Sequence, residues 1–214
     1  MRRLVSAFYH DFYPFHTFLD WSGMEAVEAP EDLKESDVLI VWGGADIHPS
    51  FYNQKPGRRM HVGPFPSRRD TIEWELMRKA KEMGVPIIGV CRGAQMLCAL
   101  EGGTLVQDVQ NHGGNHLITT NGKQNYIVNS IHHQMMNPKN TEHQLIGWSS
   151  HKLSREYHSV DEDGKDIVIE MDVEPELIYF PNCKGLAVQW HPEAMNRESQ
   201  ATKHLQTIFT EQMV

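Results

Sequence analysis

The stretch from residue 84 to residue 103 constrains the fold more than any other part of the chain. It begins with Gly84 and a short apolar run, Val85 to Val90, which has the character of a fully buried parallel strand. A glycine-containing turn, Gly89-Val-Cys-Arg-Gly93, leads from this run into a helix-forming segment, Ala94 to Glu101. A buried strand that passes through a tight turn into a helix is typical of α/β sheets.

A cysteine, Cys91, occupies the apex of this turn. Such a turn lifts its apical side chain above the sheet, and the flanking glycines let the backbone turn where a Cβ would clash. The N-terminus of the following helix would favour the thiolate form of the sulfur. The pattern therefore indicates a nucleophilic cysteine, and the alternative is a free cysteine that fills the core as a small apolar side chain.

The segments before this turn alternate between strand and helix patterns. Asp37 to Trp42 is a buried strand closed by Gly43-Gly44, and Ser67 to Met83 has the cap and the apolar spacing of a helix. This β-α-β succession predicts an α/β fold with a doubly wound, mostly parallel sheet, flanking helices and a ligand crevice at the C-terminal strand ends. Further elements are predicted nearer the N-terminus: strands at Leu4 to Phe8 and Met24 to Ala29, and a short helix or packed loop at Phe12 to Trp21.

From Thr104 onward the pattern changes to short strands separated by Gly, Asn, Asp and Pro. Several of these strands are expected to extend the sheet in antiparallel fashion, which mixed sheets tolerate at their edges. The tail, Glu198 to Gln212, has the spacing of an amphipathic helix that closes the fold. The predicted short strands are Tyr126 to Val128, His143 to Trp148, Asp166 to Val173, Leu177 to Phe180 and Leu186 to Trp190.

Composition limits the classes of protein that the chain can represent. A length of 214 residues suits one domain, 1–214, with a sizeable core, and a net charge of −8 argues against nucleic acid or a membrane as a partner. Three scattered cysteines form no disulfide framework, and no apolar run is long enough to span a bilayer. We therefore expect a cytoplasmic protein, and the sequence leaves its oligomeric state open.

A second group of reactive side chains follows the last predicted strand, where Trp190 is succeeded by His191-Pro192-Glu193. Residues two apart in extended backbone share a face, so Glu193 can orient the ring of His191. A cysteine, a histidine and a third orienting group together form the arrangement that thiol acyl transfer requires. Without Cys91, the same His-x-Glu pattern would be more simply a solvated histidine beside an unrelated glutamate.

Together these motifs resemble those of the class I glutamine amidotransferase superfamily. The resemblance to the superfamily is carried by Gly89-Val-Cys-Arg-Gly-Ala-Gln95 and Gly185-Leu-Ala-Val-Gln-Trp-His-Pro-Glu193. Three further motifs are similar to its γ-glutamyl hydrolase-like branch, the peptidase C26 group: Val41-Trp-Gly-Gly-Ala-Asp-Ile-His-Pro-Ser-Phe-Tyr52, Arg69-Asp70-x-x-Glu73 and Val128-Asn-Ser-Ile-His-His-Gln134. The match extends in order from about residue 37 to residue 193. The chain departs from that branch in Asn53, where glycine is usual, and in compressed segments before Asp37 and between Asp108 and Val128.

The resemblance implies a role for each matching residue. Cys91 would be the nucleophile, His191 the general base and acid, and Glu193 the group that orients His191. The oxyanion hole would consist of the backbone N–H groups of Gly44 and Arg92. The implied substrate-binding residues are Gln95 for the glutamyl part, and Ser130, His132 and His133 for the α-amino and α-carboxylate groups. A structural role is the alternative for His132 and His133. Asp46 is expected to brace the loop that contains Gly43-Gly44, called here the glycine loop.

Thirteen histidines raise the question of a metal site, because they include His112-x-x-x-His116 and His132-His133. Gly113-Gly114 interrupts the helix that would align the first pair, and no cysteine pair completes a site. The sequence therefore predicts no metal and no cofactor. Cys98, two helical turns after Cys91, is expected to lie in the core.

The activity implied by the resemblance is cleavage of a γ-glutamyl amide, either glutamine or a γ-glutamyl conjugate, through a glutamyl thioester. A free-standing hydrolase would release glutamate together with ammonia or an amine. A glutaminase component of an amidotransferase would instead pass ammonia to a synthetase partner on a separate chain. A third possibility is a non-enzymatic binding protein of the same fold, against which the intact Cys91, His191 and Glu193 argue. The physiological leaving group is not determined by the sequence.

Overall fold

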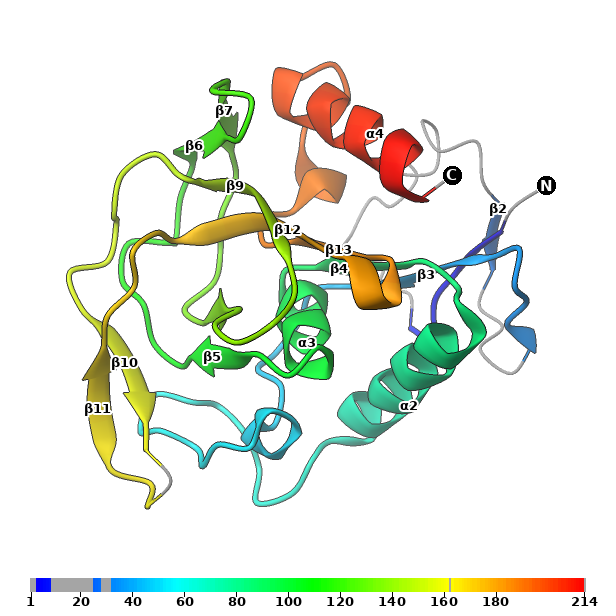
Figure 1. Cartoon of the computed structure of the whole chain (residues 1–214). Coiled ribbons are helices and arrows are strands. Elements are labelled where there is room, and N and C mark those ends of the chain that lie inside the picture. Colours follow the sequence, from blue (N-terminus) through cyan, green and yellow to red (C-terminus); the bar gives the residue numbers. More distant parts are fainter. Residues whose placement is uncertain (1–2, 9–24, 28–31, 162, 214) are drawn as a thin grey trace.

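A nine-stranded sheet runs through the centre of the molecule in the order β2-β1-β3-β4-β13-β12-β9-β6-β7 (Figure 1). The computed structural model of the chain describes residues 3–8, 25–27, 32–161 and 163–213. The strands from β2 to β13 in this order are parallel, and each following strand is antiparallel to its neighbour. The predicted α/β fold, with a mostly parallel sheet and an antiparallel extension, is therefore confirmed.

The described residues contain short strands and three longer helices. The parallel part of the sheet contains β1 (Arg3–Val5), β2 (Glu25–Val27), β3 (Val38–Val41), β4 (Ile87–Val90) and β13 (Gly185–Val188). The antiparallel part contains β12 (Pro175–Phe180), β9 (Gln144–Ser149), β6 (His116–Thr120) and β7 (Asn125–Val128). Two separate pairs are β5 (Thr104–Val106) with β8 (Met135–Asn137), and β10 (Tyr157–Val160) with β11 (Asp166–Ile169). The described helices are α2 (Arg68–Met83), α3 (Arg92–Leu100) and α4 (Gln200–Met213), with short 3₁₀ helices η2 (Pro49–Tyr52), η3 (Pro181–Cys183) and η4 (Pro192–Ala194).

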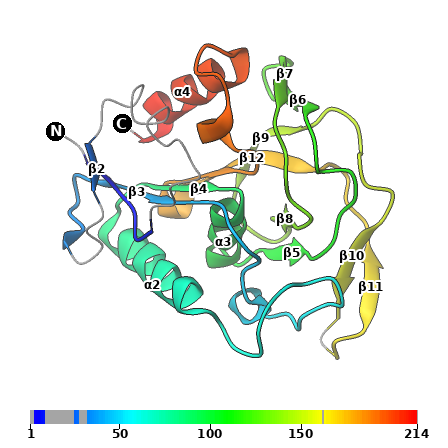
Figure 2. The ribbon, with the colours of Figure 1, turned by 180° about the vertical axis from the view of Figure 1, so that it is seen from behind.

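Helices cover both faces of the sheet, with α2 and α3 on one face and α4 on the other (Figure 1, Figure 2). The core is divided accordingly, because alternate residues of a strand face opposite sides. In β4, Ile88 belongs to the apolar cluster that contains Phe209 of α4, whereas Ile87 belongs to the cluster that contains Leu97 of α3. This two-sided burial explains why the central strands are continuous apolar runs.

Most strands lie where the sequence predicts them, but one belongs to another sheet. The predicted strand Asp166 to Val173 contains β11, which pairs with β10 in a separate hairpin. The sequence does not predict the strands β5, β6, β8 and β10, because they are short and lack a regular apolar pattern. The segment Phe12 to Trp21 lies outside the described residues. Among the helices of the described residues, none is long and apolar enough to cross a membrane.

Helix α2 carries charge on its buried side, in addition to the apolar positions that the sequence predicts. Asp70 and Glu73 are both buried, in line with Leu76, Met77 and Ala80. Buried carboxylates need partners, and these two point toward the arginine that follows Cys91. The N-terminus of this helix is therefore positioned by polar contacts as well as by apolar packing.

The predicted cap of α2 generates a stability test. Ser67 Oγ accepts a hydrogen bond from the N–H of Asp70 at 3.0 Å, and the N–H of Ser67 donates to Asp70 Oδ2 at 2.9 Å. This is a capping box, so Ser67→Ala is expected to lower the free energy of unfolding by about 1 kcal/mol, measured by urea denaturation. Glu75→Ala is the control on the same helix, since its exposed ion pair with Arg78 contributes little. Equal losses in both variants would contradict the role of the cap.

Candidate active site

Cys91 alone forms the turn between β4, which ends at Val90, and α3, which begins at Arg92. Its φ of 51° and ψ of −106° lie in a region that residues with side chains rarely occupy. The N–H of Cys91 donates to the carbonyl oxygen of Val188 at 2.7 Å, which ties the turn to β13. A strained residue held at a strand-to-helix apex has the geometry of a nucleophile elbow.

The two glycines of the turn serve close packing. Neither Gly89 nor Gly93 is among the described residues with positive φ. A Cβ on Gly93 would lie 2.0 Å from the carbonyl oxygen of Val41, and a Cβ on Gly89 would lie 2.3 Å from the carbonyl oxygen of Gly93. The glycines therefore let β4, α3 and β3 approach one another, and the backbone strain falls on Cys91 itself.

The structure brings the predicted nucleophile, base and orienting group together. His191 follows β13, and its Nδ1 is 2.7 Å from Glu193 Oε1 in η4. A Cβ on Gly43 would lie 2.7 Å from His191 Cε1 and 3.4 Å from Cys91 Cβ, so the glycine loop packs against both residues. Cys91 and His191 are each only 5% exposed, and Glu193 is 1% exposed. The cysteine, the histidine and the glutamate are thus assembled in a nearly buried site.

His191 is held as an imidazolium by its neighbours. Burial disfavours the charged ring, but hydrogen bonds with Cys91 and Glu193 outweigh burial and raise the pKa of His191 to about 10 from the ordinary 6.5. The ring is therefore protonated at neutral pH, and the charge is lost only as the pH rises through the folded-state pKa. A cationic histidine beside a cysteine is the arrangement that favours a thiolate nucleophile.

Four charged side chains connect α2 with the elbow. The guanidinium of Arg92 donates to both Glu73 and Asp70, and Arg69 Nε donates to Glu73 Oε1 at 3.0 Å. Arg92, Asp70 and Glu73 are almost completely buried, so each charge depends on its partners. The Arg69-Asp70-x-x-Glu73 motif, to which the sequence assigns no role, therefore fixes the residue directly after Cys91.

Arg69 also holds the backbone of the glycine loop. Its Nη2 donates to the carbonyl oxygens of Trp42 and Gly43, each at 3.1 Å. In a trans peptide the C=O and N–H point in opposite directions, so this contact turns the N–H of Gly44 away from Arg69. A Cβ on Gly44 would lie 3.4 Å from Arg92 Cδ, so the side chain of Arg92 packs against the glycine loop, and an oxyanion hole formed by the two backbone N–H groups stays a prediction.

Three of the predicted substrate-binding side chains make contacts within the protein. Gln95 Nε2 and His132 Nδ1 both donate to the carbonyl oxygen of Gln134, each at 2.8 Å. Ser130 Oγ donates to the carbonyl oxygen of His112 at 2.8 Å. These contacts fix the loop after β7, and binding of substrate by the three side chains stays a prediction.

His133 and Asp46 form a second link to the glycine loop. His133 Nε2 is 2.9 Å from Asp46 Oδ1, and this hydrogen bond raises the pKa of His133 above its ordinary value. Asp46 Oδ2 accepts from the N–H of His61 at 2.9 Å. Asp46 therefore braces the segment after Gly44, as the sequence predicts, through residues that are distant along the chain.

Asn129 is a positioning residue that the sequence does not single out. Its Nδ2 donates to the carbonyl oxygen of His191 at 2.9 Å, and its Oδ1 accepts from the N–H of His191 at 2.9 Å. The two bonds fix the backbone that carries the imidazole. The only sequence signal for this role is the place of Asn129 in the Val128 to Gln134 motif.

Asn53, the departure from the motif of the γ-glutamyl hydrolase-like branch, preserves the local backbone. It ends η2 with φ 56° and ψ 35°, in the left-handed region. Asparagine is one of the few residues besides glycine that adopt this conformation readily. The turn after Tyr52 is therefore kept without the glycine.

A cavity of about 150 Å³ lies beside the glycine loop. Its lining includes Asp46, His61, Phe65, Arg69 and Arg92, and Phe65 is 79% exposed. A larger hollow of about 240 Å³ lies elsewhere, next to Arg59 and Asp108, and neither space is lined by Cys91 or His191. The smaller cavity is the one that reaches the elbow, through Arg92.

Comparison with known proteins relates this site to one family. The sequence model of peptidase C26 matches residues 21–193. A protein of Mycobacterium tuberculosis whose name assigns it to the glutamine amidotransferases is 33% identical over 169 residues, covering 75% of this chain and 52% of the relative. The glutamine amidotransferase-like protein YvdE of Lactococcus lactis is 27% identical over 208 residues, covering 86% of this chain and 78% of the relative. The chain thus spans about half the length of the mycobacterial relative.

Solved structures show the same fold at low sequence identity. A structure described as one component of a GMP synthase, from Thermoplasma acidophilum, has a TM-score of 0.62 and 14% identity, covering 99% of this chain and 96% of its own. A glutamine amidotransferase structure from Thermotoga maritima has a TM-score of 0.59 and 14% identity, covering 98% of this chain and 83% of its own. At 14% sequence identity, these similarities show that the fold is shared and nothing about a shared activity.

The contact between Cys91 and His191 can be measured as a shift of a pKa. Because the hydrogen bond and the charge of Cys91 raise the pKa of His191, Cys91→Ala is expected to lower it from about 10. An NMR titration of ring-labelled histidines would follow the change, and Cys98→Ala, within the helix α3 that follows Cys91, is the matched control. An unchanged His191 pKa in Cys91→Ala would show that the two side chains do not interact.

Proposed function

Since the chain belongs to the peptidase C26 family, within the class I glutamine amidotransferase-like superfamily, we propose that it is a cysteine-dependent hydrolase of γ-glutamyl amides. The observation that carries the proposal is the placement of Cys91 at a strained elbow, beside a His191 that Glu193 orients. The substrate would be glutamine or a γ-glutamyl conjugate. The products would be glutamate and either ammonia or an amine.

In the first half of the proposed reaction, the Cys91 thiolate attacks the side-chain carbonyl carbon of the γ-glutamyl group. The resulting oxyanion accepts hydrogen bonds from the N–H groups of Gly44 and Arg92. The imidazolium of His191 gives its proton to the leaving nitrogen as the C–N bond breaks. A glutamyl thioester on Cys91 and a neutral imidazole remain.

In the second half, neutral His191 removes a proton from a water molecule, whose oxygen attacks the thioester carbonyl. The same two backbone donors stabilise the second oxyanion, and the C–S bond then breaks to restore the thiolate. Glutamate is released, and the proton taken from water stays on His191 as the resting imidazolium. Glu193 stabilises the charged ring in both halves through its contact with Nδ1.

The contacts of Arg69 favour hydrolysis by the chain alone. Arg69 sets the orientation of the Gly43–Gly44 peptide from within the chain, which supports an oxyanion hole that is formed before any partner binds. A protein that delivers ammonia to a synthetase would gain from completing this hole only on docking, because it would then waste no glutamine. The ammonia-delivering role is the second candidate, and an assay of the isolated chain distinguishes the two.

The central test measures glutamate release by the purified chain from glutamine and from a panel of γ-glutamyl amines. We expect turnover without a partner, and Cys91→Ala is expected to reduce it by about 10³-fold or more, because the covalent pathway is removed. Cys98→Ala is the control and should remain active. Negligible turnover of every substrate by folded protein, restored by adding a synthetase, would favour the amidotransferase role.

A glutamine-like electrophile gives an independent readout of the same site. It is expected to label Cys91 and spare the two other thiols, because burial raises the pKa of Cys98 to about 12 and also raises that of Cys183. Mass spectrometry of peptides from the treated chain identifies the labelled residue. Labelling of Cys183, with activity retained in Cys91→Ala, would reject the assigned nucleophile.

His191 and Glu193 are expected to differ in importance. His191→Ala should reduce kcat/KM nearly as much as Cys91→Ala, since both proton transfers pass through the ring. Glu193→Gln should be milder, because the shape of the side chain is kept while the charge that stabilises the imidazolium is lost. Steady-state kinetics of the two variants checks the difference, and a Glu193→Gln effect that is either absent or as large as that of His191→Ala would contradict these roles.

A further inference from the structure

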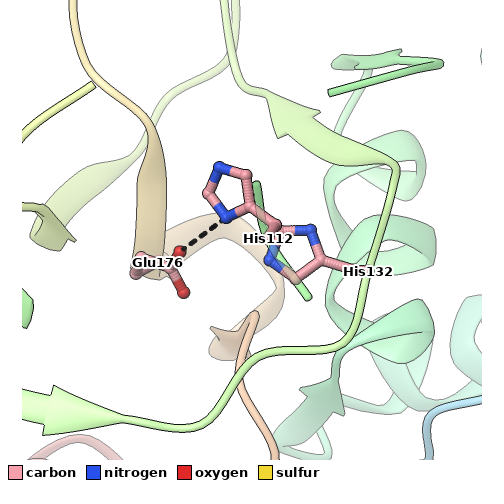
Figure 3. Close-up of side chains that lie close together, drawn as sticks. All are labelled: His112, His132 and Glu176. Carbon is pink, nitrogen blue, oxygen red and sulfur yellow. Dashed lines mark ion pairs between the residues drawn. The ribbon is translucent and has the colours of Figure 1, made fainter. Parts of the chain in front are cut away.

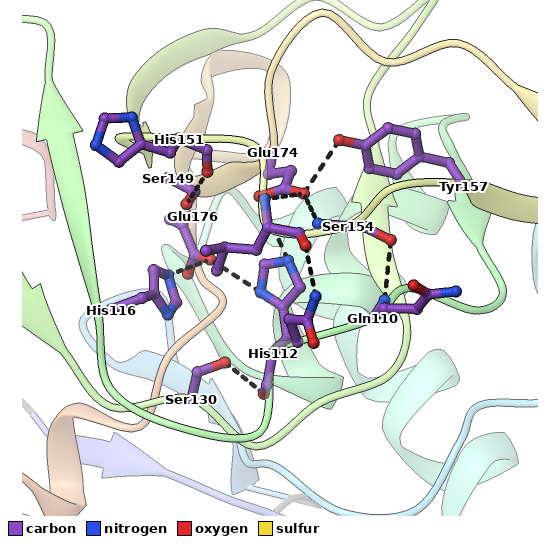
Figure 4. A network of polar contacts seen from close by, with 12 residues as sticks. Gln110, His112, His116, Ser130, Ser149, His151, Ser154, Tyr157, Glu174 and Glu176 are labelled. Carbon is purple, nitrogen blue, oxygen red and sulfur yellow. Dashed lines mark hydrogen bonds and ion pairs between the residues drawn. The ribbon is translucent and has the colours of Figure 1, made fainter.

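Five ionisable side chains gather in a cluster at the junction of β12 with the segment before β6 and the loop after β7, and Figure 4 shows four of them. Four of them are almost completely buried: the side chains of His112, Glu174 and Glu176 have no exposed surface, and that of His116 is 6% exposed. The fifth is His132, whose ring centroid is 4.5 Å from that of His112. None of the five belongs to the Cys–His–Glu arrangement.

Distant parts of the chain contribute the three side chains at the centre of this cluster. One ligand atom each from His112, His132 and Glu176 lies within 4.8 Å of the others, and the three side chains face one another in Figure 3. The sequence predicts no metal because Gly113-Gly114 separates His112 from His116. The two glycines separate only this local pair, whereas the fold joins His112 to His132 and Glu176, which lie far along the chain.

His132 has the hydrogen-bonding pattern of a metal ligand. Its Nδ1 lies 2.8 Å from the carbonyl oxygen of Gln134 and must donate to it, because a carbonyl oxygen only accepts. The lone pair is therefore on Nε2, which is buried and has no hydrogen-bond partner. Histidines that bind metals usually donate their other ring N–H to a carbonyl or carboxylate oxygen in this way.

His112 lies between two carboxylates. Its Nε2 is 3.5 Å from Glu174 Oε2 and its Nδ1 is 3.8 Å from Glu176 Oε1, and neither nitrogen has a hydrogen-bond partner. Glu174 is itself fixed by three donors: the N–H groups of Leu153 at 2.9 Å and Ser154 at 2.8 Å, and the hydroxyl of Tyr157 at 3.0 Å (Figure 4). Glu174 is thus placed to orient His112, which leaves Nδ1 directed toward Glu176.

Glu176 completes the set with one free oxygen. Its Oε1 is 2.9 Å from His116 Nε2, while its Oε2 is buried and has no hydrogen-bond partner. A buried carboxylate oxygen without a donor is costly unless a cation or a further donor contacts it. Glu176 therefore offers a buried oxygen without a hydrogen-bond partner, as His112 and His132 offer buried nitrogens without one.

We propose that His112 Nδ1, His132 Nε2 and the Glu176 carboxylate bind a divalent transition-metal ion of the zinc class. Two imidazoles and one carboxylate form a donor set that Zn²⁺ accepts, with water in the fourth position. Bonds of about 2.0–2.1 Å place tetrahedral ligand atoms about 3.3 Å apart. Binding would therefore draw closer the ligand atoms, which now lie within 4.8 Å of one another. Glu174, His116 and the carbonyl of Gln134 orient the ligands.

The ion stabilises the backbone that supports His191. The carbonyl oxygen of His112 accepts from Ser130 Oγ at 2.8 Å and from the N–H of His132 at 3.1 Å, so a ligand residue holds the loop directly after Asn129. The carbonyl oxygen of Glu176 accepts from the N–H of Gln189 at 2.9 Å, two residues before His191. The metal therefore joins β12 to the loop after β7.

The experiment is a titration of the full chain with Zn²⁺ alone, after treatment with a chelator and dialysis. Isothermal titration calorimetry and elemental analysis are expected to give one ion per chain, and Zn²⁺ is expected to raise the melting temperature. His112→Gln and Glu176→Gln should each weaken binding by about 100-fold or more, because each removes a ligand. His151→Ala, an exposed histidine outside the cluster, is the matched control and should bind as the unmodified chain does.

A second variant separates this site from the cysteine–histidine pair, which can bind zinc itself. Cys91→Ala is expected to bind one ion with unchanged affinity, and Co²⁺ in place of Zn²⁺ should show no thiolate-to-metal charge-transfer band. Loss of binding in Cys91→Ala would place the ion on the cysteine and overturn the proposal. Absence of binding by the folded chain, or unchanged affinity in both His112→Gln and Glu176→Gln with native circular dichroism, would overturn it as well.

Discussion

The buried ion network around Arg92 is the interaction on which the arrangement of the site depends. Arg92 follows Cys91 directly and reaches across to Glu73 and Asp70 on α2, and Glu73 in turn holds Arg69, which binds the carbonyls of the glycine loop. Removing the Arg92 guanidinium would leave the buried carboxylate of Asp70 without its cation, a cost of several kcal/mol. The elbow, the long helix and the loop after β3 therefore form one unit, and the position of each is set by the other two.

The sequence predicts those parts of the fold that local pattern determines. Ile87 to Val90 is apolar because both faces of β4 are covered, and Ser67 with Asp70 marks the start of α2 through contacts that span three residues. The strands β6 and β10 escape prediction, since both are short and place polar residues, Thr120 and Ser159, at buried positions. The pairing of β11 with β10 could not be read from either segment alone.

The residues of the candidate site likewise divide into those that a local motif reveals and those that only the folded structure brings together. Cys91, His191 and Glu193 are recognisable because each lies in a short motif whose spacing has a chemical meaning. The contact of Asn129 with the backbone of His191 spans 62 residues, and an asparagine in a loop has many local roles that are equally consistent with its sequence. The cluster of His112, His132 and Glu176 is hidden for the same reason: its members meet only after β12 has been placed beside β9 and β13.

The strained backbone of Cys91 affects which substitutions the protein can accept at this position. A side chain held at φ 51° and ψ −106° costs of order 1–3 kcal/mol, and a glycine would occupy the same conformation at lower cost. At this position, selection for a more stable fold and selection for a reactive thiol therefore act in opposite directions. The elbow retains a cysteine at the expense of stability. Substitution of Cys91 by a residue that adopts this backbone conformation without strain would therefore give a more stable protein that lacks its nucleophile.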